Sequence, residues 1–218
     1  MKGAGKYAEE LKGLVKKFAK DGKIQPMQKQ EPLRTLVRAM FSFDTTDAKA
    51  DEALAIVDRE FVDINELRVG TELEVEALIG AKYPQIIKRA SLISSVMNAI
   101  FDREGVLSLD RVSTLKKAEV RQFLRELPGM TPFVEGSVCL LSLDITAMPI
   151  DDMGMNYLKQ AGALDAAFGL EEAQKFIETH IKPEEIYELY AGLRRLAKEN
   201  FVPAAPPAPV EETKKKRK

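Results

Sequence analysis

The chain has 218 residues, which is enough for one large domain or for two small domains that share a hydrophobic core. Apolar residues make up 45% and charged residues 31%, a composition typical of a soluble globular protein and not of a disordered or collagen-like chain. No apolar run approaches the roughly 20 residues of a membrane-spanning helix, and the first residues are charged, unlike a signal peptide. We therefore expect an intracellular protein, cytoplasmic or nucleoid-associated, or nuclear if the source is eukaryotic.

Cysteine and histidine are almost absent, which excludes several kinds of site. The single cysteine, Cys139, rules out an internal disulfide and a four-cysteine iron–sulfur cluster. The single histidine, His180, leaves no histidine cluster for zinc. Asp151 and Asp152 are adjacent but have no third ligand at a fixed spacing, so we interpret them as charges at a helix start. We expect neither a cofactor nor a metal ion.

The net charge of −1 is unevenly distributed along the chain. Residues 1–40 carry a net charge of +6, residues 41–202 carry −10, and residues 203–218 carry +3. Basic ends favour binding to a polyanion such as DNA, although they also serve solubility alone. Charge by itself does not decide between these two interpretations.

Apolar residues recur at helical spacing from the N-terminus onward. Gly22 is expected to end a lysine-rich first helix. The second helix is expected to have Pro32 in its first turn, and the third to have Thr46 as its N-cap. A capping box of Thr71 and Glu74 is expected at the start of the fourth. A long helix is predicted from about Pro84 to Asp102. Further helices are predicted at 117–126, 132–146, 152–163, 170–180 and 184–201.

The predicted fold class is therefore all-α, with about ten helices and short loops. No alternating pattern is long enough to require a strand. Beyond Phe201 the composition changes to proline and alanine and then to Lys-Lys-Lys-Arg-Lys. We expect residues 203–218 to be a disordered tail.

One short segment suggests a function. Leu127-Pro128-Gly129-Met130-Thr131-Pro132 predicts a tight turn between two helices, with Thr131 as the N-cap and Pro132 at the first helical position. Free amides at such a helix end, Phe133 among them, attract an anion, and a DNA phosphate is a natural occupant. Taken alone, however, the segment is equally typical of any helix–turn–helix corner in an α protein.

The wider context resembles the helix-hairpin-helix DNA glycosylase superfamily, whose members are endonuclease III-like proteins of base-excision repair. The hairpin 127–129 and Met148-Pro149-Ile150-Asp151 are separated as in that family. The segment 36–47, LVRAMFSFDTTD, and the segment 79–90, with Ile79-Gly80 and Lys88-Arg89-Ala90, are also similar to family motifs. The resemblance covers roughly residues 30–200, with the motifs in the family's order.

The resemblance implies a two-lobed helical fold with a DNA cleft between the lobes. Residues 31–150 would form one lobe, containing the helix-hairpin-helix at about 117–146. Residues 151–202 would form the second lobe, joined by the basic N-terminal helix of residues 1–30. The partner implied is double-stranded DNA, intact or damaged, bound by a monomer.

The implied site residues match the family only in part. The family's catalytic aspartate falls on Asp151, and DNA contacts fall on Gly129, Thr131, Phe133, Asp44 and Lys88. The lysine nucleophile of the lyases falls on Phe133, which cannot form a Schiff base. Thr131 replaces the hairpin's second glycine, Asp44 replaces a gap-filling glutamine, Glu135 replaces a small residue, and the cluster cysteines are missing.

Three hypotheses follow from this pattern. The leading one is a DNA-binding protein with this fold that lacks abasic-site lyase activity and need not be catalytic. The second is a monofunctional DNA glycosylase that removes damaged bases using Asp151. The third is a helical protein-interaction scaffold that does not bind nucleic acid.

Overall fold

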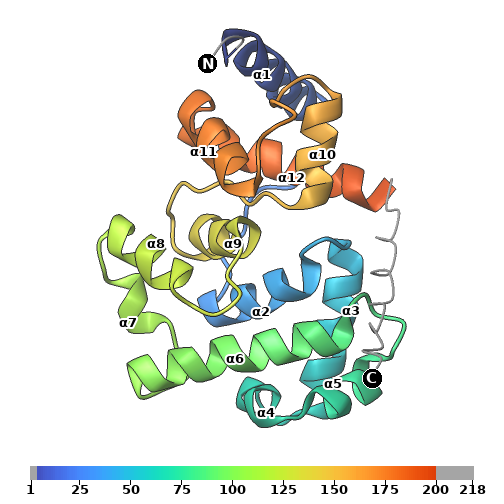
Figure 1. Cartoon of the computed structure of the whole chain (residues 1–218), viewed down its shortest axis with the longest axis vertical. Coiled ribbons are helices and arrows are strands. Elements are labelled where there is room, and N and C mark those ends of the chain that lie inside the picture. The colour runs from blue at the N-terminus through green and yellow to red at the C-terminus, as the bar shows by residue number, and fades with distance from the viewer. Residues whose placement is uncertain (1–3, 200–218) are drawn as a thin grey trace, which may run out of the picture.

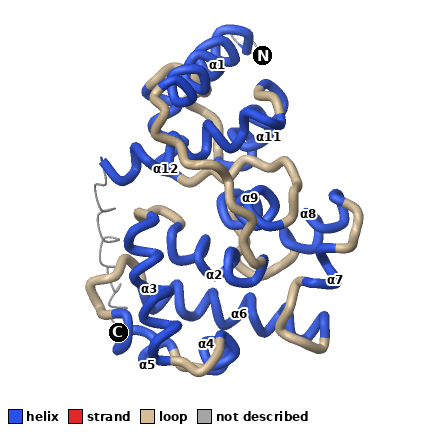
Figure 2. The backbone as a smooth tube through the Cα atoms, turned by 180° about the vertical axis from the view of Figure 1, so that it is seen from behind, coloured by secondary structure: helices blue, strands red, loops and turns tan. Residues whose placement is uncertain are grey.

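The computed structural model describes residues 4–199, which form helices joined by turns and loops, with no strand in this range (Figure 1, Figure 2). The helices are α1 (Ala4–Lys20), α2 (Pro32–Ser42), α3 (Asp47–Glu60), α4 (Ile64–Val69), α5 (Glu72–Ile79), α6 (Ile86–Glu104), α7 (Asp110–Ser113), α8 (Lys117–Arg125), α9 (Pro132–Ser142), α10 (Asp152–Gln160), α11 (Leu170–His180) and α12 (Ile186–Glu199), with a 3-10 turn at Pro183–Glu185. The all-α prediction is confirmed.

The predicted helix starts are formed by local hydrogen bonds. The Thr46 hydroxyl accepts a bond from the Lys49 amide at the start of α3. At the start of α5, the Glu74 amide donates to the Thr71 hydroxyl and the Thr71 amide donates to the Glu74 carboxylate, which completes the capping box. Pro32 occupies the first turn of α2, as expected.

Other helix boundaries differ from the sequence prediction. The helices α4 and α7, of six and four residues, are too short to show a periodic apolar pattern and were not predicted. The helix predicted for 132–146 ends at Ser142, because Asp144 takes a left-handed backbone conformation with φ of 53°. The helix predicted for 152–163 ends at Gln160, just before Gly162, which is also left-handed.

Helix α9 lies at the centre of the molecule, with α1 and α10–α12 on one side of it and α2–α6 on the other (Figure 1). Every α9 residue from Phe133 to Ser142 is buried, and the helix packs against α2, α8 and α11. Gly136 allows the loop that follows α9 to run against the helix, because a Cβ there would lie 2.7 Å from the Pro149 nitrogen and 2.8 Å from the Met148 carbonyl carbon. The loop then leads to Asp151 at the start of α10.

The basic helix α1 packs against α12 and α11, far from it in sequence. At the contact with α12, Gly192 leaves room for the Phe18 ring, which would lie 2.3 Å from a Cβ at that position. The predicted tail, residues 203–218, lies outside the described residues. Among the helices of residues 4–199, none is long and apolar enough to cross a membrane.

Candidate nucleic-acid interface

The predicted hairpin joins α8 to α9. Leu127 is buried and anchors the turn, whereas Gly129 is exposed and has a φ of +64°. A Cβ at Gly129 would lie 2.5 Å from a Leu92 methyl carbon, so both backbone conformation and space favour glycine. The Thr131 hydroxyl accepts a 3.3 Å hydrogen bond from the Val134 amide, which makes Thr131 the N-cap of α9 as predicted.

A pocket of about 320 Å³ lies beside this hairpin, between α2, the start of α6 and the start of α9. It is lined by Met40, Phe43, Asp44, Gln85, Lys88, Arg89, Leu92, Gly129, Thr131 and Val134. Four of the residues predicted for DNA contact, Asp44, Lys88, Gly129 and Thr131, thus come together around one cavity. The volume is at the lower end of the range for small-ligand sites, about 300–1,000 Å³.

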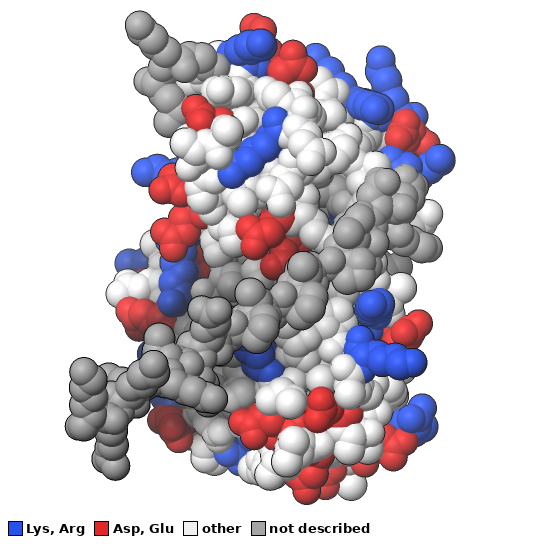
Figure 3. All heavy atoms as spheres, turned by 45° about the vertical axis from the view of Figure 1, so that its right-hand side comes forward, with Lys and Arg blue, Asp and Glu red and all other residues white. Residues whose placement is uncertain are grey.

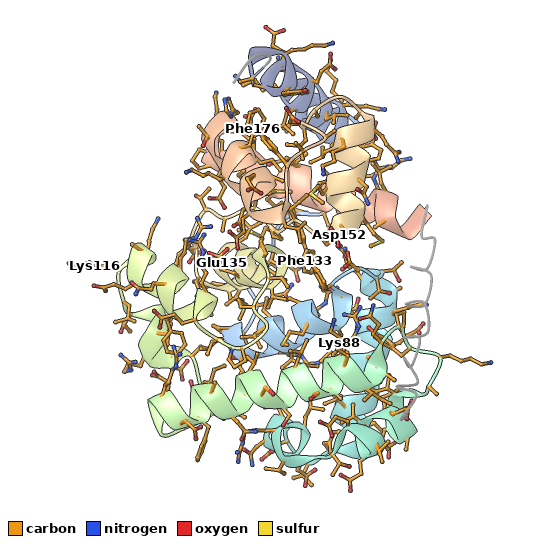
Figure 4. The ribbon with its side chains drawn as sticks, in the orientation of Figure 1. Lys88, Lys116, Phe133, Glu135, Asp152 and Phe176 are labelled. Carbon is orange, nitrogen blue, oxygen red and sulfur yellow. The ribbon has the colours of Figure 1, made fainter. Side chains whose placement is uncertain are left out.

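Lys88 supplies positive charge at this pocket. Its side chain is exposed, and it has no ion-pair or hydrogen-bond partner among residues 4–199. Figure 4 shows Lys88 on α6, on the side of that helix toward Phe133 and Asp152. The face in Figure 3 carries basic and acidic side chains side by side, so attraction of a polyanion there depends on individual cations.

Asp44 also lines the pocket. It has a left-handed backbone conformation (φ 49°), and its Oδ1 accepts a 3.0 Å hydrogen bond from the Asp152 amide at the start of α10. Burial, followed by the charges of Asp151 and Asp152, raises the pKa of the Asp44 carboxyl to about 6. Asp44 therefore titrates close to neutral pH.

Asp151 is buried and does not line the pocket. Its Oδ1 accepts a 2.8 Å hydrogen bond from the Gly154 amide, and its Oδ2 lies 2.9 Å from a guanidinium nitrogen of Arg194. Only 5% of the Asp151 side chain and 6% of the Arg194 side chain are exposed. Burial raises the pKa of Asp151, and the charge of Arg194 opposes that rise. These contacts are those of a helix cap within a buried ion pair.

Arg194 connects α12 to the loop between α2 and α3. Its guanidinium donates to the Thr45 carbonyl at 2.7 Å, to the Ser42 carbonyl at 3.3 Å and to the Asp47 carboxylate at 2.8 Å, besides Asp151. No sequence pattern distinguishes Arg194, because an arginine in an amphipathic helix normally lies on the solvated face. Arg194 lies inside the molecule because α12 packs against α1, α3 and α10.

Phe133 is buried among two aromatic rings and the Arg194 guanidinium. Its side chain is 1% exposed, and the ring centroids of Phe43 and Tyr190 lie 6.0 and 6.5 Å from its own. The Arg194 guanidinium lies 5.0 Å from the same ring centroid. The Phe133 side chain is thus part of the core and does not line the pocket, so its predicted contact with DNA could be made only by its amide.

Glu135, which replaces a small residue of the family, is buried and paired with charged side chains. Its carboxylate is 1% exposed and accepts hydrogen bonds from Arg121 and from the Gln174 amide. Arg121 also binds Glu178, which in turn accepts a bond from the Met148 amide. This network joins α8, α9 and α11, so the Glu135 charge is compensated inside the protein.

The loop before α3 is positioned by Arg89, another residue whose contacts no sequence pattern indicates. Its guanidinium donates to the carbonyls of Met40 and Phe43 at 2.6 Å and of Pro84 at 2.8 Å.

No group of three Asp, Glu, His or Cys side chains among residues 4–199 is arranged to hold a metal ion. The site therefore consists of backbone amides, a few polar side chains and apolar walls.

Neither a protein-family model nor a curated protein matches this sequence. Solved structures do match. A structure of endonuclease III trapped in a covalent intermediate with DNA superposes with a TM-score of 0.69 at 15% identity, covering 92% of this chain and 90% of that one. An 8-oxoguanine glycosylase/lyase of Clostridium acetobutylicum bound to double-stranded DNA gives 0.68 at 17% identity, covering 89% and 70%.

A third match is the 3-methyladenine DNA glycosylase of H. pylori bound to 1,N6-ethenoadenine, with a TM-score of 0.65 at 13% identity, covering 88% of this chain and 97% of that one. The chain has the fold of the helix-hairpin-helix DNA glycosylases. This agrees with the fold implied by the sequence motifs. At sequence identities of 13–17%, the similarity concerns the fold and does not establish a catalytic activity.

Proposed function

We propose that this chain binds duplex DNA through the hairpin and the adjoining end of α6, and that it does not cleave DNA at abasic sites. One observation carries the proposal. The exposed hairpin glycine, Gly129, and the Lys88 ammonium border the same pocket at the start of α9. Amides at a helix start and a nearby ammonium are groups that bind backbone phosphates. The DNA-bound structures that share this fold support the same interpretation.

Lyase chemistry would require an amine nucleophile at the reacting sugar. The position that corresponds to the lyase lysine carries the buried ring of Phe133. Base removal by a monofunctional route would require a carboxylate that reaches the sugar or a water beside it. Both oxygens of Asp151 are engaged, one by the Gly154 amide and the other by Arg194. We therefore favour a non-catalytic DNA-binding protein over a monofunctional glycosylase.

Fluorescence anisotropy with a labelled duplex, titrated at several salt concentrations, tests DNA binding directly. Lys88→Gln should weaken binding and lower the slope of log affinity against log salt by about 1. The matched control is Lys116→Gln, which removes an exposed lysine at the far end of α8 (Figure 4) and should leave the slope unchanged. Absence of salt-dependent binding at low ionic strength would contradict the proposal and favour a protein-interaction scaffold.

A separate experiment tests catalysis. Oligonucleotides carrying an oxidised, deaminated or alkylated base are incubated with the protein and then treated with alkali. We expect no strand breaks above background. Breaks that disappear in Asp151→Asn, but persist in the control Asp152→Asn, would support the monofunctional glycosylase instead. Asp152 is the appropriate control because it is adjacent, exposed and not paired with Arg194.

A further inference from the structure

A second pocket, of about 360 Å³, is lined by residues of the segment that joins α1 to α2, of the start of α3 and of α12. Among residues 4–199, no residue lines both this pocket and the pocket beside the hairpin. Leu141, near the end of α9, also lines it. At 1.5 Å per residue, Leu141 lies about 14 Å along the helix from Pro132, where the hairpin ends. The second pocket is therefore separate from the candidate nucleic-acid interface.

The walls of this second pocket are held together by hydrogen bonds between distant segments. The Tyr187 hydroxyl of α12 donates to the Gln25 carbonyl at 3.1 Å, and the Gln30 amide donates to the Leu141 carbonyl at 3.0 Å. Both bonds fix the segment before α2 against the rest of the molecule. Tyr187 and Tyr190, whose ring centroids lie 6.4 Å apart, give the pocket an aromatic wall. A flat or apolar group can pack against such a wall.

Tyr190 brings a buried hydroxyl to this pocket. Only 6% of the residue is exposed, and its hydroxyl makes no hydrogen bond to any other group of residues 4–199. Burial raises the pKa of Tyr190 above its usual value, so the hydroxyl remains protonated and can donate. Buried hydroxyls in folded proteins normally have a partner. Tyr190 therefore lacks an acceptor that a ligand in the pocket could supply.

Two further donors on the wall of the pocket also lack an acceptor in the described part of the chain. The Nε atom of Arg195 is buried and has no hydrogen-bond partner, although another nitrogen of the same guanidinium donates to Asp21 at 2.7 Å. The Lys23 ammonium is exposed and has no ion pair within residues 4–199. A ligand that brings several acceptors and a negative charge would satisfy all three donors.

The other charges of the pocket are already compensated. Asp47 is the one carboxylate among its lining residues, and it lies 2.8 Å from Arg194 and 3.7 Å from Arg38. Arg38 also pairs with Asp51, and Arg194 with Asp151. Asp47 thus presents little uncompensated negative charge to repel an anion. The uncompensated charge on the wall is that of Lys23, which is positive.

We propose that this pocket binds a small phosphate monoester, with the phosphate oxygens accepting hydrogen bonds from Lys23, Tyr190 and Arg195. A phosphate monoester has three terminal oxygens, one for each unpaired donor, whereas a carboxylate has two. The ester group would pack against the tyrosine rings. A volume of about 360 Å³ lies within the range of sites for small molecules, about 300–1,000 Å³. The proposal does not depend on the DNA binding proposed above.

Isothermal titration calorimetry of the full chain with phenyl phosphate tests the site. We expect saturable binding to one site. Phenol lacks the phosphate and should not bind, inorganic phosphate lacks the ring and should bind more weakly, and benzoate should bind more weakly because it offers two oxygens. An excess of duplex DNA should leave the binding of phenyl phosphate unchanged, because the pocket is separate from the hairpin.

Tyr190→Phe should weaken the binding of phenyl phosphate about tenfold, because one hydrogen bond to a charged group is lost. The ring remains, and Tm without ligand should not fall, since the hydroxyl makes no bond within residues 4–199. Lys23→Gln should also weaken binding. The matched controls are Tyr157→Phe and Lys20→Gln, which lie outside the pocket and should bind phenyl phosphate as the parent protein does.

No binding of phenyl phosphate, or binding that Tyr190→Phe and Lys23→Gln both leave unchanged, would overturn the site. Equal binding of phenol, or tighter binding of benzoate, would overturn the assignment of phosphate. Binding of inorganic phosphate as tight as that of phenyl phosphate would overturn the packing of an ester group against the rings. Competition by duplex DNA would overturn the assignment to a small molecule. A protein that binds phenyl phosphate but no duplex would contradict only the proposed DNA binding.

Discussion

The Arg194→Met substitution tests whether Asp151 is held as a structural ion pair. The substitution removes the guanidinium but keeps a long apolar side chain beside Phe133. The Asp151 carboxylate, of which 5% is exposed, would keep the Gly154 amide but lose Arg194, its one ion-pair partner among residues 4–199. The carbonyls of Ser42 and Thr45 would lose a donor as well.

Removing one partner of a buried ion pair costs about 3–5 kcal/mol, because the remaining charge stays buried and uncompensated. That loss is a large part of the 5–15 kcal/mol by which a domain of this kind is usually stable. For a chain of this length it corresponds to a fall in Tm of roughly 10 °C. Adding Asp151→Asn to Arg194→Met should recover about 1–3 kcal/mol, since it removes the stranded charge.

The loss should depend on pH. Without Arg194, the pKa of Asp151 rises further, because burial still raises it and the opposing charge is gone. A carboxyl with a raised pKa in the folded state favours folding while it is protonated, and this contribution is lost as pH rises through the folded-state pKa. The deficit of Arg194→Met relative to the parent protein should therefore be smaller at about pH 5 than at about pH 8.

Urea unfolding followed by circular dichroism, at both pH values, measures these differences. The control is Arg195→Met, the next residue of α12, whose ion pair with Asp21 is more exposed and should be worth less than about 1 kcal/mol. A loss for Arg194→Met no larger than that of Arg195→Met, or one that does not change with pH, would refute the structural role. So would a double variant with Asp151→Asn that is no more stable than Arg194→Met alone.

Three other variants give independent checks. The raised pKa of Asp44 means that its ionised form is unfavourable in the folded protein. Asp44→Asn should therefore stabilise the protein by about 2 kcal/mol above pH 7, after allowing for partial exposure, and should have no effect near about pH 4. Measurements of Tm at several pH values test this prediction. Gly136→Ala should lower the free energy of unfolding in urea by about 1–3 kcal/mol, because the new Cβ would meet backbone atoms. Gly13→Ala in α1, where no atom lies close to the new Cβ, should leave the free energy of unfolding unchanged or raise it. Phe133→Lys should give no borohydride-trapped complex with abasic DNA, since the lysine would replace a buried ring beside Arg194; a trapped complex would show that the reacting sugar can reach this position.

Local features of the site were predictable because neighbouring residues produce them. The turn at Gly129, the Thr131 cap and Pro132 at the start of α9 depend on backbone preferences over six residues. Asp44 and Lys88 were named from the family resemblance and do border one pocket with the hairpin. Gln85 could not be found in the same way, because its left-handed backbone and its place at the pocket have no periodic signal.

The electrostatic state of the site could not be predicted, because it depends on contacts between distant segments. Glu135 is neutralised by Arg121 on α8, and Asp151 by Arg194, which is 43 residues further along the chain. A helical pattern shows that residues share a face, but it does not show which face meets which neighbour. The burial of Phe133 between Phe43 and Tyr190 likewise depends on contacts between segments that are distant in sequence.

The amino-acid sequence alone determined the helical class, most helix starts and the hairpin, because these follow from spacing and capping within a few residues. It also determined that cysteine clusters and a lysine at position 133 are lacking. Only the tertiary structure decided that Asp151 is a buried cap paired with Arg194, and that Asp44, Lys88 and the hairpin enclose one pocket. The physical reason is that burial and charge pairing arise where helices distant in sequence pack together, and these interactions set which polar groups are left to bind a ligand.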